Sequence, residues 1–583
     1  MLKNLTHLKK YFVKYRTKYF LGFIFIFFSN IGQVYIPILL RNSINELHNK
    51  IEFELVIKNV LLIIGTAMVA GVFRFLIRQT IIVASREIEY DLRQDFWAHI
   101  QKLPLRFFQN NSTGNIMAHA TSDISAVRMF VGPSIMYSTD TGLRFLLVLP
   151  MMLWMSASLT FYALLPLPIL SFAVYSVMKK VHSRYTKIQE KFSDLTTKAQ
   201  ENFSGIRVIK SYFREEFEIS EFTKESQEYL NRNMSLVKIR SLFQPVFFMI
   251  SGLSSIIVLW IGGKMIMENQ LSLGTIVAFF AYLMMLIWPM IAFGWVANMI
   301  QQADASMKRL LKIFNEPYEI DESGKTNYNI KTLEGKIEFV NVKFKYSENL
   351  PLVLDNISFK ISKGESVAFV GHTGVGKTSL INLIARMYDV SEGKVLIDGV
   401  DVRNIPLTVL RKNIGLVPQE NFLFSDTLKN NILYGYPNGN QELLFKVSEV
   451  SQMKKDVDTF PNGYQTILGE RGITLSGGQK QRTSLARALA VDPKILILDD
   501  SFSAVDTHTE EEILRQLKDF MKNRTSIIIS HRISTVQDCD KIFVLDNGKI
   551  AETGTHNELI EKGGIYADLY QKQLLEQELS ELS

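Results

Sequence analysis

Two adjacent carboxylates, Asp499 and Asp500, end the stretch ILILDD at residues 495–500. Four branched aliphatic residues precede them, which is the pattern of an inner strand of a parallel sheet, buried on both faces. Open α/β sheets place their functional groups at the carboxyl ends of such strands. The stretch therefore predicts a strand that delivers two acid groups to an active site, and it leaves open what each acid does.

A glycine-rich stretch follows a second apolar run. The residues SVAFV (366–370) fit a buried strand, and GHTGVGKTS (371–379) comes directly after them. The spacing satisfies G-x-x-x-x-G-K-[ST] in the strand-to-helix context that a phosphate-binding loop requires. The residues that we expect to bind a nucleotide here are Gly371, His372, Thr373, Gly374, Val375, Gly376, Lys377, Thr378 and Ser379.

The residue types in this loop suit a nucleoside triphosphate with Mg²⁺. Glycines let the backbone wrap closely around phosphate with its N–H groups pointing inward. We expect Lys377 to reach the β- and γ-phosphates and the Thr378 hydroxyl to ligate Mg²⁺. A second anion site is predicted at LSGGQKQR (475–482), where Ser476 can N-cap the next helix and two glycines expose backbone donors.

With these two glycine-rich stretches the chain resembles the ATP-binding cassette (ABC) superfamily, and the other motifs of that family follow in order. The resemblance implies that Tyr346 stacks on adenine, that Gln419 in LVPQE senses Mg²⁺ and the attacking water, and that His531 in ISHR contacts the γ-phosphate. GERG (469–472) resembles the short loop that exporters place before the signature, and SAVD (503–506) the loop that meets the opposite subunit. The signature residues that the resemblance places against a nucleotide are Ser476, Gly477, Gly478 and Gln479.

The resemblance, which covers residues 336–575, also separates the two acids. Asp499 matches the carboxylate that holds Mg²⁺, directly or through water, alongside the ligands Thr378 and Gln419. Asp500 stands where the family usually has Glu, the residue that polarises the attacking water. The catalytic set implied for ATP and Mg²⁺ is Lys377, Gln419, Asp500 and His531.

The elements that must carry this chemistry differ between the two halves of the 583-residue chain, because long uncharged stretches occur before about residue 305. Residues 19–40 form 22 residues without a charge, about 33 Å as a helix and enough to cross a bilayer. The 34 uncharged residues between Arg144 and Lys179 are too many for one crossing, so we expect a turn near residues 156–158. The six predicted spans are residues 19–40, 57–85, 133–156, 158–180, 241–263 and 272–300.

Lysine and arginine placement predicts the orientation. Six lie in residues 1–18, five in 86–128 and thirteen in 179–240, against four in the two opposite-side segments. Both termini and the ATPase domain should therefore be cytosolic, in an integral protein of the bacterial inner membrane. The predicted fold is an all-α six-helix transmembrane domain (1–320), a linker (321–332), an α/β P-loop ABC ATPase domain (333–575) and a C-terminal tail (576–583).

Net charge argues against a nucleic-acid-binding protein, and cysteine content argues against a protein stabilised by disulfides. Lysines and arginines that flank the spans explain most of the net charge of +7, so we expect no nucleic-acid partner. The single Cys539 excludes an intrachain disulfide framework and fits a reducing cytosolic face.

The loops of the membrane half resemble those of ABC exporters. LPLRFFQNNSTGNIMAHATSDI looks like the first intracellular loop and ENFSGIRVIKSYFREEFE like the second, each with a short coupling helix. The resemblance implies that two chains swap helices and enclose two ATP molecules, so a chain with one P-loop and one signature must dimerise. We expect export of a drug-like, lipid or peptide substrate, hydrophobic or amphipathic, from the cytosolic side or inner leaflet by alternating access. The alternative is a regulatory or channel-type ABC protein that ATP gates without active transport.

Asp500 leaves two kinds of dimer open. Its side chain is one methylene shorter than Glu, and a displacement of about 1 Å can lower a rate on the order of 10²-fold. In one interpretation a backbone adjustment restores the distance, and the chain works as a slower homodimer. In the other, which we favour, a second half-transporter supplies a competent site that the intact LSGGQ of this chain completes, while the P-loop of this chain forms the weaker site.

Charged residues inside the predicted spans form a candidate substrate vestibule. Arg74 and Arg78 lie one helical turn apart in the second span, and Asp140 and Arg144 have the same spacing in the third, where they can pair. These arginines could snorkel to the headgroups of membrane lipids, with Arg144 neutralising Asp140. They could instead form a basic inner vestibule that attracts amphiphiles with anionic heads.

Overall fold

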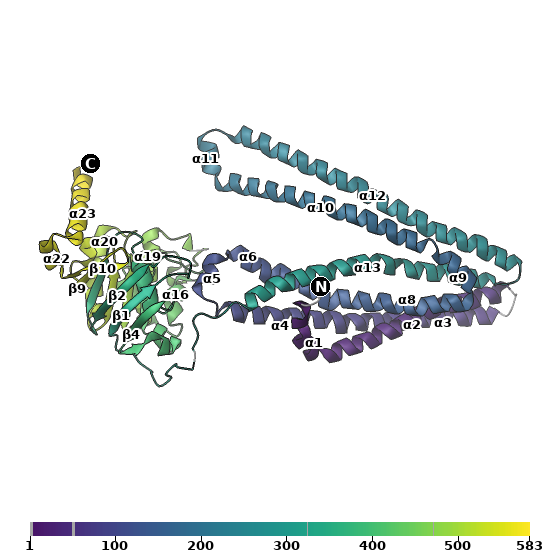
Figure 1. Ribbon diagram of the computed structural model, residues 1–583, viewed down its shortest axis with the longest axis horizontal. Coiled ribbons are helices and arrows are strands. Elements are labelled where there is room, and N and C mark those ends of the chain that lie inside the picture. Colours follow the sequence, from purple (N-terminus) through teal and green to yellow (C-terminus); the bar gives the residue numbers. More distant parts are fainter. Residues whose placement is uncertain (1–3, 49–52, 323, 470–471, 583) are drawn as a thin grey trace. The chain divides into compact units, whose positions relative to one another are not determined.

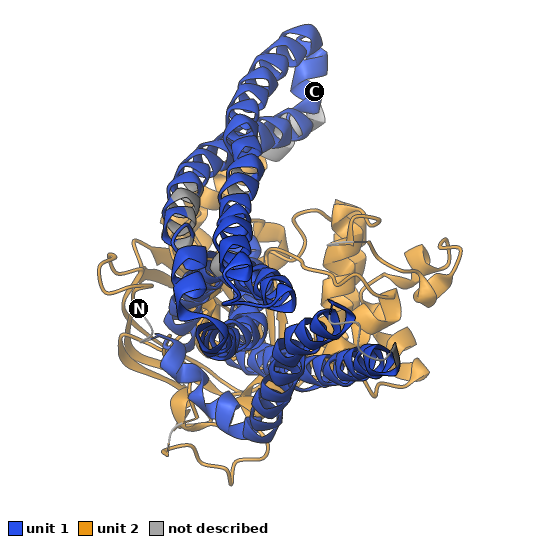
Figure 2. Ribbon diagram, turned by 90° about the vertical axis from the view of Figure 1, so that its right-hand side faces the viewer, with its two compact units in different colours: residues 1–100, 113–315 blue, residues 101–112, 316–583 orange. Residues whose placement is uncertain are grey.

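The computed structural model describes residues 4–48, 53–322, 324–469 and 472–582. These residues form two compact units (Figure 2). Unit 1 comprises residues 1–100 and 113–315 and is helical, whereas unit 2 comprises residues 101–112 and 316–583 and combines sheets with helices.

Unit 1 is built from long helices, of which α10 and α12 run side by side as a hairpin (Figure 1). α2 packs against α3, α8 and α13, and the Tyr282 hydroxyl of α13 donates a hydrogen bond of 2.8 Å to the Val34 carbonyl of α2. The helical segments, with η1 a 3-10 turn and η2 to η4 π-helical, are η1 (Asn4–Leu8), α1 (Lys9–Lys14), α2 (Arg16–His48), α3 (Phe53–Ile77), η2 (Arg78–Ile82), α4 (Val83–Ile100), α6 (Thr113–Ala118), η3 (His119–Asp123), α7 (Ile124–Met129), η4 (Phe130–Ser134), α8 (Ile135–Met155), α9 (Ala157–Leu164), α10 (Leu167–Ser204), α11 (Ile206–Ser211), α12 (Glu215–Met267) and α13 (Leu273–Phe314).

Four helical stretches of the described residues are long and apolar enough to cross a membrane: Arg16–His48, Glu54–Ile100, Glu215–Met267 and Leu273–Phe314. They contain or overlap the predicted spans 19–40, 57–85, 241–263 and 272–300. The other two predicted spans fall on η4 with α8 and on α9 with α10, and the count of six stays a prediction.

The join between the third and fourth predicted spans has two features. α8 ends at Met155, and the Ser156 hydroxyl accepts a hydrogen bond of 3.3 Å from the Leu159 N–H, so Ser156 N-caps α9 where the turn is expected. The span expected to be continuous over residues 158–180 is interrupted, because α9 ends at Leu164 and α10 begins at Leu167. Pro166 lies in this break, and proline has no amide hydrogen to continue a helix.

Unit 2 is centred on a six-stranded sheet in the order β10-β9-β3-β8-β7-β6. All five residues of β7 are buried, and β7 pairs in parallel with β6 and β8, which confirms the inner strand predicted from ILILDD. Successive residues of β7 alternate between two hydrophobic cores, Ile495 and Ile497 in one and Leu496 and Leu498 in the other. The strands are β3 (Ser366–Val370), β6 (Ile414–Val417), β7 (Ile495–Asp499), β8 (Thr525–Ile529), β9 (Lys541–Asp546) and β10 (Lys549–Gly554).

A smaller antiparallel sheet in the order β2-β1-β4-β5 completes the β-structure of the described residues of unit 2. Its strands are β1 (Ile337–Phe344), β2 (Leu354–Ile361), β4 (Glu392–Ile397) and β5 (Val400–Asp401). The helical segments of unit 2 are α5 (Leu105–Asn110), α14 (Lys377–Ile384), η5 (Val402–Asn404), α15 (Leu407–Lys412), α16 (Leu428–Ile432), η6 (Leu433–Gly435), α17 (Gln441–Val450), α18 (Lys454–Val457), η7 (Gly463–Gln465), α19 (Gly477–Ala490), α20 (Thr507–Met521), α21 (Ile533–Val536), α22 (His556–Lys562) and α23 (Ile565–Leu582).

Two predicted boundaries differ from the compact units. The helix α5, which lies in the predicted first intracellular loop, belongs to unit 2. There the Tyr388 hydroxyl donates a hydrogen bond of 3.1 Å to Gln109, and Arg106 forms an ion pair with Glu319. Unit 1 ends at Asn315, directly after α13, rather than at residue 320. The helix α23 continues through the predicted tail as far as Leu582.

Candidate nucleotide site

A pocket of about 310 Å³ in unit 2 gathers most of the predicted site residues. It lies at the ends of β3, β7 and β8 and at the start of α14, as expected for the carboxyl edge of a parallel sheet. The predicted residues among its lining are Tyr346, Thr373, Gly374, Gly376, Lys377, Thr378, Ser379, Gln419, Asp499, Asp500 and His531. Three members of the predicted loop, Gly371, His372 and Val375, do not line it, nor do the signature residues 476–479.

The glycine-rich loop has a backbone that only glycine adopts easily. Gly371, Gly374 and Gly376 have φ values of +147°, +85° and +105°. A Cβ atom on Gly371 would lie 2.3 Å from the Leu545 carbonyl oxygen, and one on Gly376 would lie 2.9 Å from the Leu354 side chain. The loop therefore turns from β3 into α14 in a path that excludes side chains at these positions.

Lys377 is buried, and its ammonium group donates hydrogen bonds of 2.8 and 2.9 Å to the carbonyls of Gly371 and His372. Burial lowers the pKa of Lys377, while the charges of Asp499 and Asp500 act in the opposite direction. The loop carbonyls thus hold a cation beside Asp499, the last residue of β7, and Asp500, which follows it.

Asp499 is only 2 % exposed and accepts a hydrogen bond of 2.9 Å from the Thr378 hydroxyl. Burial raises the pKa of Asp499, since one hydroxyl compensates little of the lost hydration of a carboxylate. A hard divalent cation prefers oxygen ligands of this kind and would stabilise the ionised form. The pair Thr378 and Asp499 therefore fits Mg²⁺.

Asp500 follows the end of β7 in a left-handed conformation with φ of +46°. Its N–H donates a hydrogen bond of 2.8 Å to the Ile529 carbonyl at the end of β8, which holds this turn of the backbone. Asp adopts positive φ more readily than most residues with a side chain. The side chain of Asp500 lines the same pocket as Lys377 and His531.

His531 and Gln419 complete the lining from the segments after β8 and β6, and both are exposed. Partial burial and the charge of Lys377 lower the pKa of His531, while Asp500 acts in the opposite direction. Tyr346 forms a hydrogen bond of 2.7 Å with the Ser379 hydroxyl, and its ring packs edge-on against Tyr388 with centroids 5.2 Å apart.

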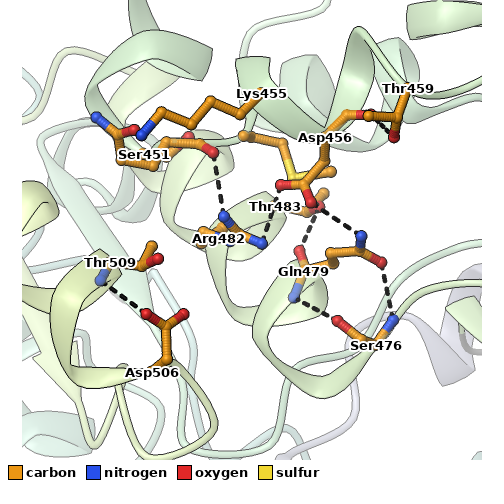
Figure 3. A network of polar contacts seen from close by, with 12 residues as sticks. Ser451, Lys455, Asp456, Thr459, Ser476, Gln479, Arg482, Thr483, Asp506 and Thr509 are labelled. Atoms are coloured by element: carbon orange, nitrogen blue, oxygen red, sulfur yellow. Dashed lines mark hydrogen bonds and ion pairs between the residues drawn. The ribbon is translucent and has the colours of Figure 1, made fainter.

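The signature begins α19 as predicted. Ser476 is the N-cap in a capping box, accepting a hydrogen bond of 3.3 Å from the Gln479 N–H while its own N–H donates one of 2.9 Å to the Gln479 side chain (Figure 3). A Cβ atom on Gly478 would lie 2.9 Å from the Ala504 carbonyl oxygen, so the helix approaches the SAVD loop closely. Residues 470 and 471 of the predicted GERG loop lie outside the described residues.

Sequence reasoning missed the residues that fix this start of α19. Asp456 accepts a hydrogen bond of 2.9 Å from Gln479 and forms an ion pair of 2.9 Å with Arg482 (Figure 3). The Gln481 side chain binds the SAVD loop. It donates a hydrogen bond of 2.9 Å to the Ser503 hydroxyl and accepts one of 2.9 Å from the Ala504 N–H. Helical spacing could have predicted that Gln481 lies on the buried face of α19, whereas no pattern in the sequence indicated the contacts of Asp456.

The four residues of the candidate vestibule also lie together. A pocket of about 340 Å³ in unit 1 is lined by Arg74, Arg78, Asp140 and Arg144, beside the apolar residues Ile26, Ile77, Met136 and Trp288. Arg144 and Asp140 form the expected ion pair at 3.3 Å.

Two polar residues of α2, which the sequence did not single out, tie this cluster together. The Asn30 side chain donates a hydrogen bond of 2.8 Å to Asp140 and accepts one of 3.1 Å from Arg144. The Gln33 side chain accepts hydrogen bonds of 3.1 Å from Arg144 and 3.3 Å from Arg74. Arg144 is buried, and Arg74 and Arg78 are exposed. Arg78 begins the π segment η2, a distortion that often occurs at functional sites.

Known proteins match both halves of the chain. The family model described as "ABC transporter transmembrane region" matches residues 19–290, and the one described as "ABC transporter" matches residues 354–503. The chain is similar in fold to a solved bacterial Atm1-family ABC exporter with ATP bound, with a TM-score of 0.76 and 24 % identity over 96 % of this chain and 98 % of that one.

Relatives match over nearly the full length. The uncharacterized ABC transporter ATP-binding protein YknU of Bacillus subtilis is 36 % identical over 98 % of both chains. The probable multidrug resistance ABC transporter ATP-binding/permease protein YheI of the same organism is 36 % identical over 99 % of this chain and 98 % of its own length. The multidrug resistance-like ATP-binding protein MdlA of Escherichia coli is 33 % identical over 88 % of this chain and 87 % of its own. The chain therefore belongs to the ABC transporters of the exporter type, integral membrane proteins whose ATPase domain couples ATP hydrolysis to transport.

Proposed function

We propose that this chain exports a hydrophobic or amphipathic compound, drug-like, lipid or peptide, from the cytosolic side or inner leaflet by alternating access. The observation that carries the proposal is the pocket of about 340 Å³ in unit 1, where exposed arginines lie beside apolar side chains. Among the described lining residues, Asp140 is the one carboxylate beside three arginines, so the lining carries an excess of positive charge. Such a pocket suits an amphiphile with an anionic head, which could come from a membrane lipid or from the cytosol.

The geometry of the site supports a role for each nucleotide residue. Lys377 would neutralise phosphate charge, Thr378 and Asp499 would hold Mg²⁺ with Gln419 nearby, and His531 would support the γ-phosphate. Mg²⁺, when bound, would offset the negative charge that develops on the phosphates. Asp500 accepts a hydrogen bond from the attacking water and orients it, at the reach that an aspartate allows.

We infer that the working unit is a dimer. The signature residues 476–479 do not line the pocket built on the P-loop of their own chain, which supports a second chain as the source of that side of the site. The tip of the α10–α12 hairpin exposes Phe203, Tyr212 and Phe213 by 78, 75 and 88 %, and a partner would cover such side chains. A second half-transporter is the favoured partner, and a homodimer is the alternative.

Transport assays distinguish an exporter from a regulatory or channel-type protein. Inverted membrane vesicles that contain the dimer should accumulate an anionic fluorescent amphiphile when ATP is added, and vanadate should stop the accumulation. Uptake in this assay also tests the proposed orientation, with both termini and the ATPase domain cytosolic, because the domain must meet added ATP. ATP hydrolysis without accumulation of any amphiphile from a panel of anionic, neutral and cationic compounds would favour the regulatory function.

A further inference from the structure

The segment that presents His531 is held from outside the nucleotide pocket. His531 lies between β8 and α21, and its side chain lines the pocket with Lys377 and Asp500. Within the described residues the imidazole makes no hydrogen bond of its own. Its position therefore depends on how the backbone of residues 530–535, the switch loop, is fixed.

One amide from the C-terminal helix binds this backbone at two points directly after the histidine side chain. The Ile533 N–H donates a hydrogen bond of 2.9 Å to the Gln573 side-chain oxygen, and the Gln573 amide nitrogen donates one to the His531 carbonyl. Gln573 belongs to α23, which begins at Ile565, thirty residues after the end of the loop. A primary amide has both a donor and an acceptor, so it can satisfy the two groups of opposite polarity at once.

A buried carboxylate holds the same loop from a different helix. Glu510 of α20 is 3 % exposed, accepts a hydrogen bond of 2.6 Å from the Thr535 hydroxyl and forms an ion pair with Arg532. α20 follows directly after the SAVD loop at residues 503–506. Glu510 therefore fixes the side chains of the switch loop, while Gln573 fixes its main chain.

We propose that Gln573 is a positioning residue for ATP hydrolysis, holding the backbone of His531 so that the ring meets the γ-phosphate. The proposal rests on the proposed role of His531. A ring without a hydrogen bond of its own can turn or move with its backbone, and a displacement of about 1 Å is enough to lower a rate severely. The C-terminal helix is thereby part of the hydrolytic machinery and not only a cover for the domain.

Gln573→Leu removes both hydrogen bonds at similar side-chain size, and Gln571→Leu is the matched control on an exposed position of the same helix. In the purified dimer with its native partner, hydrogen exchange of the Ile533 amide should become about tenfold faster in Gln573→Leu and stay unchanged in Gln571→Leu. Unchanged exchange in Gln573→Leu, with the protein folded, overturns the hydrogen-bonded arrangement.

Kinetics then test the positioning role. Gln573→Leu should lower kcat while KM for ATP stays the same, and it should have no further effect in a His531→Ala background, because the two act as one unit. An additive loss, or a loss confined to KM, overturns the proposal. A His531→Ala variant that keeps full activity contradicts instead the proposed role of the histidine, and the exchange measurement still decides whether Gln573 holds the loop.

Two truncations test the same point without a substitution. A chain ending at residue 575 keeps Gln573 and should hydrolyse ATP at the full rate, whereas a chain ending at residue 572 should behave like Gln573→Leu. Equal activity of the two truncated chains would overturn the proposal.

Discussion

At the scale of single residues, Asp499 is the acid whose surroundings most restrict its role. Its carboxylate is buried, one hydroxyl contacts it, and Lys377 is held by carbonyls in the same pocket. An isolated buried charge of this kind is costly unless a cation accompanies it. These surroundings support our proposal that a metal–phosphate group binds between Asp499 and Lys377.

The first prediction is that Lys377→Ala or Asp499→Asn abolishes ATP turnover. Each change removes a charge that contacts the phosphate–Mg²⁺ unit, where its loss weakens transition-state stabilisation by several kcal/mol. Turnover is measured as released phosphate from the purified dimer, with Lys360→Ala on the exposed face of β2 as the control. More than about a tenth of the wild-type rate, after correction for contaminants, contradicts the assignment.

Sequence patterns predicted the members of this site better than its backbone. Spacing within GHTGVGKTS was enough to place Thr373, Gly374 and residues 376–379 around one pocket, because a P-loop is a local structure. The left-handed turn at Asp500 was not predictable, since it depends on the Ile529 carbonyl from a strand that follows later in the chain. A contact with a strand that lies far along the chain cannot be recognised from the sequence around the residue that it constrains.

At the scale of elements, the helical spacing of charges predicted the pairing of Asp140 with Arg144 but not the polar partners on α2. Asn30 and Gln33 stand in an apolar run, and which face of α2 meets α8 is decided by packing of the whole unit. The break at Pro166 was missed for another reason. Hydropathy counts proline as a tolerable residue, although it removes the N–H that would continue the helix.

The second prediction concerns the two exposed arginines of the membrane pocket. If Arg74 and Arg78 attract anionic heads, the double variant Arg74→Gln/Arg78→Gln should weaken stimulation of ATPase activity by anionic amphiphiles more than by neutral ones. The motivation is their shared pocket and the absence of any ion pair to either within the described residues. Stimulation curves with matched anionic and neutral detergents measure the difference.

A control for charge lies on α4, where Arg93→Gln removes a cation outside the predicted spans. It should leave both stimulation curves unchanged. An equal loss for anionic and neutral compounds in the double variant would favour arginines that only reach the lipid headgroups.

At the scale of the whole molecule, each chain carries one P-loop and one signature, and these two elements do not meet in one pocket of the described residues. The fold class, the inner strand β7 and the capping start of α19 were readable from the sequence. The identity of the partner was not, because it depends on a surface of another chain. The dimer therefore has to be decided by experiment, and Asp500 offers the means.

The last prediction separates the two dimers. In a homodimer, Asp500→Asn should remove nearly all hydrolysis, because both sites lose the carboxylate that orients water. Asp500→Glu should keep or raise the rate, since the longer side chain restores the usual reach.

In a heterodimer whose partner has Glu at this position, Asp500→Asn should change turnover only modestly, because the affected site is already slow. Substitution of Ser476 and Gly477 should then be far more damaging, since these residues complete the fast site of the partner. We favour the second pattern, because one missing methylene stands beside an intact signature. It fails if this chain, purified alone, forms a stable dimer whose ATPase activity disappears with Asp500→Asn.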